Sequence, residues 1–329
     1  MKTFTSAHPR DVQQAAKLAQ QARAGGRKAA FAGGGSDMLG MIKDRIATPD
    51  VLVHLRAIQG LDQVETAAGK VTIGGLITLG ALSRNALVRS QYAVLAEAAE
   101  SVATPQIRNA GTLAGNVCQR PWCWYFRNGF PCFKAGGNTC FSATGENQFH
   151  AIFGGGPSFI VHPSDTAPAL VALDAKFRIV GPNGERTLAA ADFFTLPRVN
   201  AARENALAED EILASVEIPA ARAGMRSMYH KVLDREAWTH AIVSAAIVLE
   251  MDRDVCRSAR IVLGGVAPIP WRVPEAERLL AGQRITSDLA AKAAGTALAG
   301  ATPLAKNAYK VPLTKQIVER SVYALAARA

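Results

Sequence analysis

The most constraining feature of the chain is a stretch in which four of its five cysteines lie close together. Cys118, Cys123, Cys132 and Cys140 are separated by four, eight and seven residues. Pro, Gly and Asn interrupt the stretch, which predicts a long loop rather than a regular helix or strand. A loop of this length inside a compact domain is usually functional. Four thiolates on such a loop can converge on a metal centre. The bound metal would then order the loop in place of a hydrophobic core.

Three chemical interpretations of the cysteines compete. Disulfides need an oxidising compartment, and a chain of 329 residues buries a sizeable core without them. A four-cysteine zinc site normally shows tight C-x2–4-C pairs, and only the first gap fits that spacing. An iron–sulfur cluster takes four thiolates at looser spacing and is favoured, although these gaps match no ferredoxin run. Neighbouring aromatic residues would shield a cluster from water, or else form an ordinary hydrophobic patch or a subunit contact: Trp122, Trp124, Tyr125, Phe126, Phe130 and Phe133.

Composition narrows the class of protein. The formal net charge is +10, but Lys and Arg are scattered rather than gathered in a motif. This pattern argues against nucleic-acid binding and favours a basic surface that meets an acidic partner subunit. No run of about 18 apolar residues occurs, so we expect no membrane span. The N-terminal residues lack the apolar core of a signal peptide, which predicts a cytoplasmic protein.

Two glycine-bearing segments predict a site for an extended ligand. Residues 28–32 form an apolar strand that opens into the turn Gly33–Asp37. Such a turn lets backbone N–H groups approach a phosphate closely, and Ser36 adds a hydroxyl. Residues 104–116, TPQIRNAGTLAGN, combine two glycines with polar side chains and lead directly into the cysteines. Together the segments suggest two sides of one ligand, such as a dinucleotide, with two unrelated surface turns as the alternative.

The rest of the pattern predicts an α+β chain. Helices are predicted at residues 11–24, 78–87, 92–102 and 166–173, and strands at 51–55, 61–66, 70–74, 159–161, 176–180, 186–188 and 212–218. Ser164 or Asp165 is placed to cap the helix at 166–173. Beyond a boundary at 219–224, strands are predicted at 225–232, 241–251 and 258–264, and helices at 274–281, 289–300 and 312–326. Cys256 is expected to be a small buried hydrophobic residue.

The motifs AGGGSD, TPQIRNAGTLAGN and HPSDTAPAL, in this order and spacing, resemble the flavoprotein (medium) subunit of the molybdenum hydroxylases. That family includes xanthine dehydrogenase, carbon monoxide dehydrogenase and bacterial aldehyde oxidoreductases. The resemblance covers essentially the full chain. The cysteine-rich insertion, residues 117–150, is similar to that of bacterial three-subunit aldehyde oxidoreductases, whose flavin subunit also holds a [4Fe-4S] cluster. The resemblance thus implies four cluster ligands: Cys118, Cys123, Cys132 and Cys140.

The resemblance implies a two-subdomain PCMH-type FAD-binding domain over residues 1–220. A smaller α+β C-terminal domain, an antiparallel sheet with helices, would cover residues 225–329. The turn that would cradle the pyrophosphate of FAD consists of Phe31, Ala32, Gly33, Gly34, Gly35, Ser36 and Asp37. The other side of FAD would be lined by Ile107, Arg108, Gly111, Thr112, Gly115 and Asn116. Ser164 and Asp165 would bind ribityl or ribose hydroxyls, Lys231 would approach the flavin, and Leu207 would pack near its ring.

The implied function is electron transfer rather than substrate hydroxylation. In such complexes a large subunit binds the molybdenum cofactor, and a small subunit carries [2Fe-2S] clusters that pass electrons to FAD and then to an external acceptor. The alternatives are the corresponding subunit of a 4-hydroxybenzoyl-CoA reductase or xanthine dehydrogenase-type complex, a stand-alone flavin oxidase, and a zinc-loop scaffold. Against an oxidase, the flavin motifs have no adjacent His or Tyr pair suited to base and orienter. Export as a folded complex, with a signal on a partner subunit, would make the protein periplasmic instead.

Overall fold

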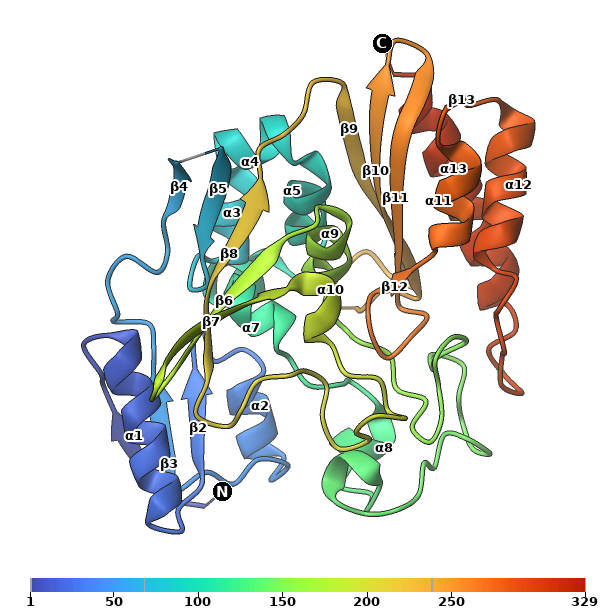
Figure 1. Ribbon diagram of the computed structural model, residues 1–329. Helices are drawn as coiled ribbons and strands as arrows, with labels where there is room; N and C mark the ends of the chain where they lie inside the picture. Colours follow the sequence, from blue (N-terminus) through green and yellow to red (C-terminus); the bar gives the residue numbers. More distant parts are fainter. Residues whose placement is uncertain (1, 68, 238, 329) are drawn as a thin grey trace.

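The computed structural model describes residues 2–67, 69–237 and 239–328. Three sheets follow one another along the described chain, each with helices packed on it (Figure 1). We call these parts the N-terminal unit (residues 5–54), the middle unit (residues 64–219) and the C-terminal unit (residues 225–326). The segment 118–150, here called the cysteine loop, runs outside the three sheets (Figure 1).

The N-terminal unit is a three-stranded parallel sheet in the order β1-β3-β2. Its elements are β1 (Thr5–Ala7), α1 (Val12–Ala24), β2 (Ala29–Ala32), α2 (Met38–Lys43) and β3 (Val51–His54). The side chain of Asp11 accepts a hydrogen bond from the backbone N–H of Gln14 at 2.7 Å and caps α1. The buried face of α1 consists only of alanines, so the helix lies close to the strands. The predicted helix at 11–24 is confirmed.

The middle unit is an antiparallel sheet in the order β4-β5-β8-β6-β7. Its strands are β4 (Val64–Ala67), β5 (Lys70–Gly74), β6 (Lys176–Gly181), β7 (Gly184–Ala189) and β8 (Ile212–Pro219). Its helices include α3 (Leu79–Arg84), α4 (Ala86–Gln91), α5 (Ala93–Glu100) and α9 (Thr166–Ala172), with α10 (Ala190–Phe193) after the hairpin. The predicted helix at 78–87 is interrupted, because Asn85 has extended backbone (ψ 124°) and its side chain caps α4.

Two sequence predictions for the middle unit were wrong. Residues 104–116 were expected to be polar turns, but they form α6 (Pro105–Ala110) and α7 (Leu113–Val117). The hydroxyls of Thr104 and Thr112 cap these helices, which explains part of the polar composition. Residues 159–161 were expected to be a strand. This part of the chain instead makes isolated backbone hydrogen bonds to other loops. For example, His162 N–H donates to the Ala267 carbonyl at 2.9 Å.

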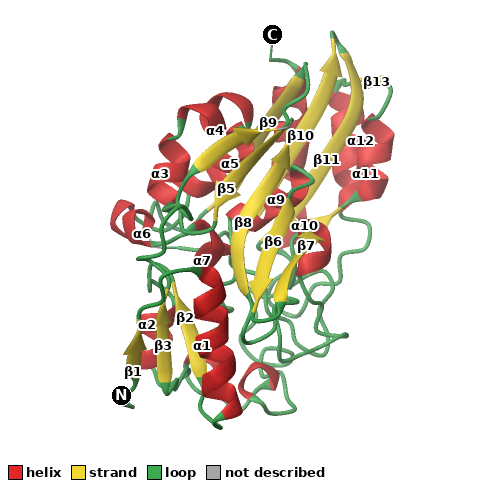
Figure 2. Ribbon diagram, turned by 60° about the vertical axis from the view of Figure 1, so that its left-hand side comes forward, coloured by secondary structure: helices red, strands yellow, loops and turns green. Residues whose placement is uncertain are grey.

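The C-terminal unit is an antiparallel sheet covered by helices on both faces (Figure 2). Its strands are β9 (Met225–Val232), β10 (Val243–Asp252), β11 (Val255–Gly264), β12 (Trp271–Arg272) and β13 (Gln283–Arg284). Its helices are α11 (Pro274–Leu280), α12 (Ser287–Ala297) and α13 (Lys310–Ala326), and they cover one face, whereas α5 and α9 of the middle unit cover the other. Central β10 is therefore buried on both sides, with Ile247 in one core and Val248 in the next. Cys256 is fully buried, as predicted.

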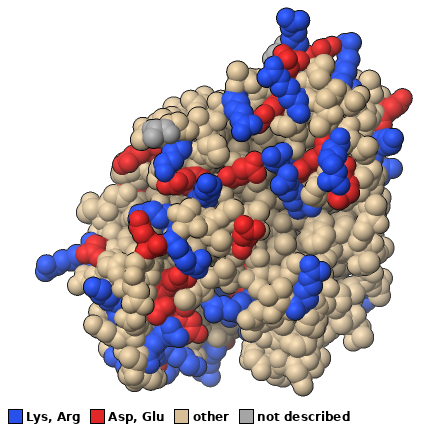
Figure 3. Space-filling model, viewed as in Figure 1, with Lys and Arg blue, Asp and Glu red and all other residues tan. Residues whose placement is uncertain are grey.

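The cysteine loop contains little regular structure. Among the described residues it has only the short helix α8 (Trp124–Arg127) and the 3-10 turn η1 (Phe133–Ala135). On the face shown in Figure 3, basic and acidic side chains are mixed over most of the surface. Within the described ranges, no helix is long and apolar enough to cross a membrane.

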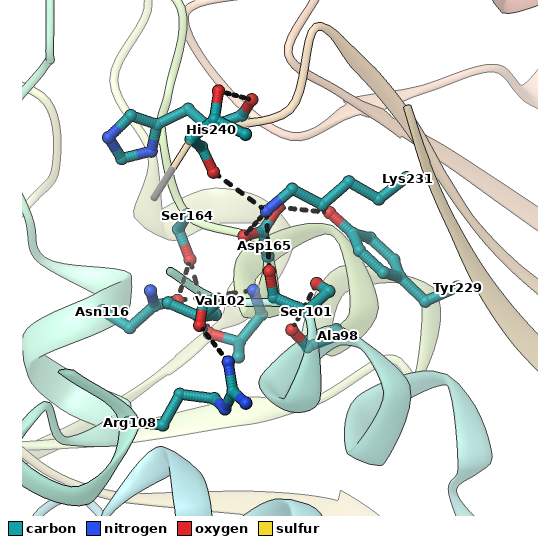
Figure 4. A network of polar contacts seen from close by, with 12 residues as sticks. Ala98, Ser101, Val102, Arg108, Asn116, Ser164, Asp165, Tyr229, Lys231 and His240 are labelled. Atoms are coloured by element: carbon teal, nitrogen blue, oxygen red, sulfur yellow. Dashed lines mark hydrogen bonds and ion pairs between the residues drawn. The ribbon is translucent and has the colours of Figure 1, made fainter. Parts of the chain in front are cut away.

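A buried ion pair joins the C-terminal unit to the middle unit (Figure 4). Lys231 on β9 donates to Asp165, which directly precedes α9, at 2.7 Å. Both side chains are only 4% exposed. Tyr229 O–H donates to the other oxygen of Asp165 at 2.7 Å, and the Lys231 ammonium also donates to the Ser101 carbonyl at 2.9 Å. Because every charge in this group has a partner, the contact holds the two units in one relative position.

Removing one charge of this pair should be far more destabilising than removing both. Lys231→Met leaves Asp165 buried and unpaired, so we expect the free energy of unfolding to fall by about 3–5 kcal/mol. In Asp165→Asn/Lys231→Met the amide oxygen still accepts the Tyr229 hydroxyl, so most of that loss should be recovered. Urea denaturation of the FAD-free protein measures both variants.

The control is Lys70→Met. The Lys70–Glu217 pair has the same 2.7 Å separation, but its side chains are 44% and 24% exposed. An exposed pair of this kind contributes about 0–1 kcal/mol. If Lys231→Met proved no more destabilising than Lys70→Met, the buried pair would not hold the units together.

Candidate functional site

A cavity of about 280 Å³ lies where the middle unit, the C-terminal unit and the start of the cysteine loop meet. Ser36 and Asp37 reach it from the N-terminal unit, and Thr112 and Asn116 reach it from the α6–α7 segment. Asp165 lines it from the start of α9. The remaining wall residues are Leu79, Val102, Ala103, Ile107, Gly111, Gly115, Gln119, Trp122, Pro163, Arg235, Thr239 and His240. The cavity therefore draws on every part of the fold.

The glycine turn, residues 33–37, packs directly on the segment between α6 and α7. A Cβ added to Gly34 would lie 1.7 Å from the Ala110 carbonyl oxygen, so a larger residue cannot make this approach. A Cβ on Gly111 would lie 3.3 Å from Ser36 Oγ. The two glycine segments therefore touch at this point, and both line the same cavity. Their placement on two sides of one ligand stays a prediction.

Asp37 binds the cysteine loop rather than being free to face a ligand. Its Oδ1 accepts from Arg127 Nη2 at 2.8 Å, and its Oδ2 accepts from the backbone N–H of Arg120 at 3.1 Å. The Arg127 guanidinium also lies over the ring of Trp122, 4.2 Å from its centre. Since Trp122 lines the cavity, this contact fixes one of its walls. Asp37 therefore lines the cavity as one half of an ion pair.

Asn116 organises the polar side of the cavity. Its Oδ1 accepts hydrogen bonds from the hydroxyls of Ser164 and Thr166, both at 2.6 Å. The Ser164 hydroxyl oxygen in turn accepts from the backbone N–H of Ala167 at 3.0 Å. Ser164 is thus the residue whose side chain caps α9, while Asp165 makes no capping bond. Asn116 Nδ2 makes no bond to the described residues and is available to a ligand in the cavity.

Two groups beside Asp165 have shifted pKa values. Burial, and next the charge of Asp165, raise the pKa of Tyr229 well above its usual value, so its hydroxyl remains a donor. Burial also lowers the pKa of His240, whose ring lies 5.2 Å from that of Trp122. Figure 4 shows His240 and Lys231 beside Asp165. Neutral His240 and protonated Tyr229 leave Asp165 and Lys231 as the charged pair of this wall.

The four clustered cysteines do not act as one group. Burial raises the pKa of Cys123 to about 11, and the charges of Cys132 and Cys140 add to this rise. These three thiols therefore lie near one another. Cys118 instead packs against the core of the middle unit, and burial alone raises its pKa to about 12. Among the described residues, no three His, Cys, Asp or Glu side chains are arranged to hold a metal ion. The predicted four-cysteine ligand set is not preformed among the described residues and stays a prediction.

The structure brings about half of the predicted cofactor residues to the cavity. Those lining it are Ser36, Asp37, Ile107, Gly111, Thr112, Gly115, Asn116 and Asp165. Ser164 and Lys231 contact lining residues, and Phe31, Ala32, Gly33, Gly34 and Gly35 support the wall from β2 and its turn. Arg108 donates to the Val102 carbonyl at 2.8 Å instead, and Leu207 packs against the middle core.

Sequence reasoning missed Tyr229, Trp122 and His240 as parts of this site. Tyr229 and Lys231 occupy alternate positions on β9 and share one face, so the strand pattern could have identified Tyr229. Trp122 was assigned to shielding the cysteines, to a hydrophobic patch or to a subunit contact. No signal in the sequence indicated that His240 would reach the cavity.

Comparisons with known proteins agree with this architecture. Residues 2–221 match the family model described as FAD binding domain in molybdopterin dehydrogenase, and residues 228–325 match the CO dehydrogenase flavoprotein C-terminal domain. The chain is 36% identical over 322 residues to the aldehyde oxidoreductase FAD-binding subunit PaoB of Escherichia coli (strain K12), covering 96% of both chains. It is 28% identical to the carbon monoxide dehydrogenase medium chain of Hydrogenophaga pseudoflava, covering 97% of this chain and 96% of that one.

Solved structures give the same result. A chain of the Cu,Mo-CO dehydrogenase in its cyanide-inactivated form superposes with a TM-score of 0.79 at 26% identity, and 100% of each chain is covered. A chain of the Hydrogenophaga pseudoflava carbon monoxide dehydrogenase gives a TM-score of 0.78, with 99% of this chain and 98% of that chain covered. The chain therefore belongs to the FAD-binding medium subunits of the molybdenum hydroxylases, the carbon monoxide dehydrogenase family.

Proposed function

We propose that this chain is the FAD-binding electron-transfer subunit of a molybdenum-containing aldehyde oxidoreductase. It would receive electrons from the [2Fe-2S] clusters of a small subunit, while the molybdenum cofactor lies on a large subunit, and pass them to an external acceptor. The observation that carries the proposal is full-length similarity to an aldehyde oxidoreductase FAD-binding subunit, combined with a cavity built from all three units. We assign residues 1–220 to the FAD-binding domain and 225–329 to the C-terminal domain.

The residues around the cavity fit a flavin dinucleotide. The glycine turn and Ser36 offer backbone N–H groups and a hydroxyl where the backbones of two segments meet, which suits a pyrophosphate. Thr112, Asn116 and Asp165 would bind hydroxyl groups further along the cavity. Bound FAD would supply an exchange of two electrons, taken up or released singly or together. The protein's contribution is to orient the flavin and to keep the charged pair Asp165–Lys231 beside it.

The carboxylates of the cavity favour a relay over a flavin oxidase with its own substrate. Asp165 is engaged by Tyr229 and Lys231, and Asp37 by Arg127 and Arg120. Neither carboxylate is free to remove a proton from a substrate, because each already accepts hydrogen bonds from cationic or neutral donors. This arrangement supports substrate chemistry on another subunit.

We also propose that the cysteine loop binds an iron–sulfur cluster through Cys123, Cys132 and Cys140, and not through Cys118. The three thiols lie near one another, and His150 Nε2 lies 3.3 Å from Cys123 Sγ. Metal sites are rarely preformed in a chain without metal, so closing this group on a cluster would complete the site. The fourth ligand of a [4Fe-4S] cluster would then be a group other than cysteine, as histidines are in Rieske centres.

Gly34→Ala should weaken FAD binding. The added Cβ would meet the Ala110 carbonyl at 1.7 Å and push the glycine turn away from the α6–α7 segment. We expect FAD affinity to fall by more than about tenfold, which corresponds to about 1.4 kcal/mol. The ratio of FAD to protein after purification and a calorimetric titration with FAD measure the change.

Gly40→Ala is the matched control. Gly40 lies in α2, and a Cβ there would meet nothing within 4 Å. This variant should bind FAD normally and keep the helix, since Ala favours helices by about 1 kcal/mol over Gly. Normal FAD content in a folded Gly34→Ala protein would contradict the proposed binding wall.

Replacement of single cysteines should distinguish the proposed cluster ligands from Cys118, which is not one of them. Iron and acid-labile sulfide should be lost from Cys132→Ser, because one thiolate of the cluster is removed. Cys118→Ser should retain them, because that side chain faces the core. Iron analysis of the purified complex, with the [2Fe-2S] content of the small subunit subtracted, measures about four iron atoms per chain if the cluster is [4Fe-4S]. Loss of iron from Cys118→Ser, or zinc in its place, would contradict the assignment.

A further inference from the structure

The end of the cysteine loop is held by a segment of the C-terminal unit. We call residues 148–152 the exit segment and residues 302–310, which lead into α13, the strap. Each of the five carbonyls of the exit segment accepts a hydrogen bond from the strap. The donors, in the order of those carbonyls, are Tyr309 O–H at 2.9 Å, Lys310 Nζ at 2.9 Å, Asn307 Nδ2 at 3.0 and 3.2 Å, and Thr302 N–H at 2.7 Å. The strap therefore fixes the backbone of a segment that lies outside the three sheets.

Lys310 is the strap residue with a buried charge. Its side chain is fully buried, and Nζ donates to the carbonyls of Phe149 at 2.9 Å and Gly265 at 2.7 Å. Both acceptors are neutral, and among the described residues no carboxylate forms an ion pair with this ammonium. Burial lowers the pKa of Lys310 to about 7. Because buried charges in proteins are normally paired or lie at a metal centre, this ammonium indicates an anionic group nearby.

The other cations that hold the cysteine loop differ from Lys310 in this respect. Each of them pairs with a carboxylate: Arg127 with Asp37, and Arg120 and Lys134 with Glu204. Lys231, the buried cation beside the FAD cavity, pairs with Asp165 in the same way. Lys310 departs from this pattern, so its anionic partner is to be sought among groups other than carboxylates.

A cysteine of the proposed cluster lies close to this ammonium. Lys310 binds the Phe149 carbonyl, and the next residue is His150, whose own carbonyl accepts from Asn307 at 3.0 Å. The ring of His150 reaches Cys123, with Nε2 3.3 Å from Sγ. Burial, and next the charge of Lys310, lower the pKa of His150 to about 4, so the ammonium acts at this ring. The strap therefore places a positive charge one side chain away from a cysteine of the proposed cluster.

We infer that Lys310 is a positioning residue for the iron–sulfur cluster of the cysteine loop and raises the reduction potential of that cluster. The inference rests on the proposed function, which assigns the cluster to Cys123, Cys132 and Cys140. A cluster bound by thiolates becomes more negative when it accepts an electron, and a buried cation nearby stabilises that state. The negative charge in turn keeps the ammonium protonated despite its burial.

Lys310→Met removes the charge and keeps most of the volume of the side chain. In the purified complex, a redox titration followed by electron paramagnetic resonance gives the midpoint potential of the cluster, identified as the signal that Cys132→Ser lacks. We expect the ratio of reduced to oxidised cluster at a fixed potential to fall about tenfold, a shift of about 59 mV to more negative potential for a one-electron couple. Iron analysis of the same sample establishes that the cluster is loaded.

Lys310→Gln repeats the test with a neutral side chain that keeps N–H donors for the Phe149 and Gly265 carbonyls. Since it also lacks the charge, the same shift to more negative potential is expected. This variant decides the question where Lys310→Met does not fold.

Two other strap residues provide matched controls. Tyr309→Phe removes a neutral hydrogen bond to the exit segment, at the carbonyl of Gln148. Lys306→Met removes a strap cation whose side chain is 49% exposed. Neither variant should shift the midpoint potential, because the first changes no charge and the second changes one that water and salt screen.

The inference is overturned if the loaded cluster has the same midpoint potential in the unmodified protein and in the Lys310 variants. An equal shift in Tyr309→Phe would also overturn it, since the strap would then act through packing alone. Loss of iron from both Lys310 variants, with normal FAD content and with Tyr309→Phe still loaded, would support it, because the loop would need the charge to keep its cluster. Absence of iron from this chain in the unmodified complex would instead contradict the proposed cluster.

Discussion

The structure depends on a buried carboxylate that cannot remain unpaired. Asp165 is taken out of water at the start of α9, and the loss of its hydration is offset by the Lys231 ammonium and the Tyr229 hydroxyl. The same ammonium donates to the carbonyls of Ser101 and Thr239, at 2.9 Å and 3.4 Å. One side chain therefore sets the positions of α5, α9 and the segment after β9. The cavity belongs to neither the middle nor the C-terminal unit alone, because its walls are fixed by a contact between them.

Backbone contact at the glycine turn fixes a second wall of the cavity. Gly34 lets the turn reach the Ala110 carbonyl, so the N-terminal unit is fixed against the α6–α7 segment before any ligand binds. A glycine-rich turn after a strand is usually interpreted only as a phosphate cradle. Here the absence of a side chain also allows two units to pack together. Preorganised walls reduce the entropy lost when a flexible dinucleotide binds.

The fold was largely predictable from the sequence, whereas the partners of individual side chains were not. Apolar-rich runs identified the strands of the C-terminal unit, and helical spacing identified α1, because burial leaves these patterns in the sequence. The helix at 78–87 was predicted too long, since an Asn cap inside a helical pattern is a local hydrogen-bond choice. The sequence placed either Ser164 or Asp165 as the cap of α9, and Ser164 performs that role. Spacing could not distinguish them, because the ion pair with Lys231 joins residues 66 positions apart.

The partners of the cysteines could not be identified from their spacing either, and their loop is ordered in part by contacts that the sequence did not indicate. Counting them suggested that four thiolates and a metal would replace a missing core, but Cys118 already packs against the core of the middle unit. Charged contacts hold the loop as well. Arg127 pairs with Asp37 while lying over Trp122, and Arg120 and Lys134 both pair with Glu204, whose side chain is only 8% exposed. Charged hydrogen bonds in such buried surroundings are stronger than those in water. Since Arg127 links the glycine turn to Trp122, which lines the cavity, the position of the loop and the shape of the cavity are set together.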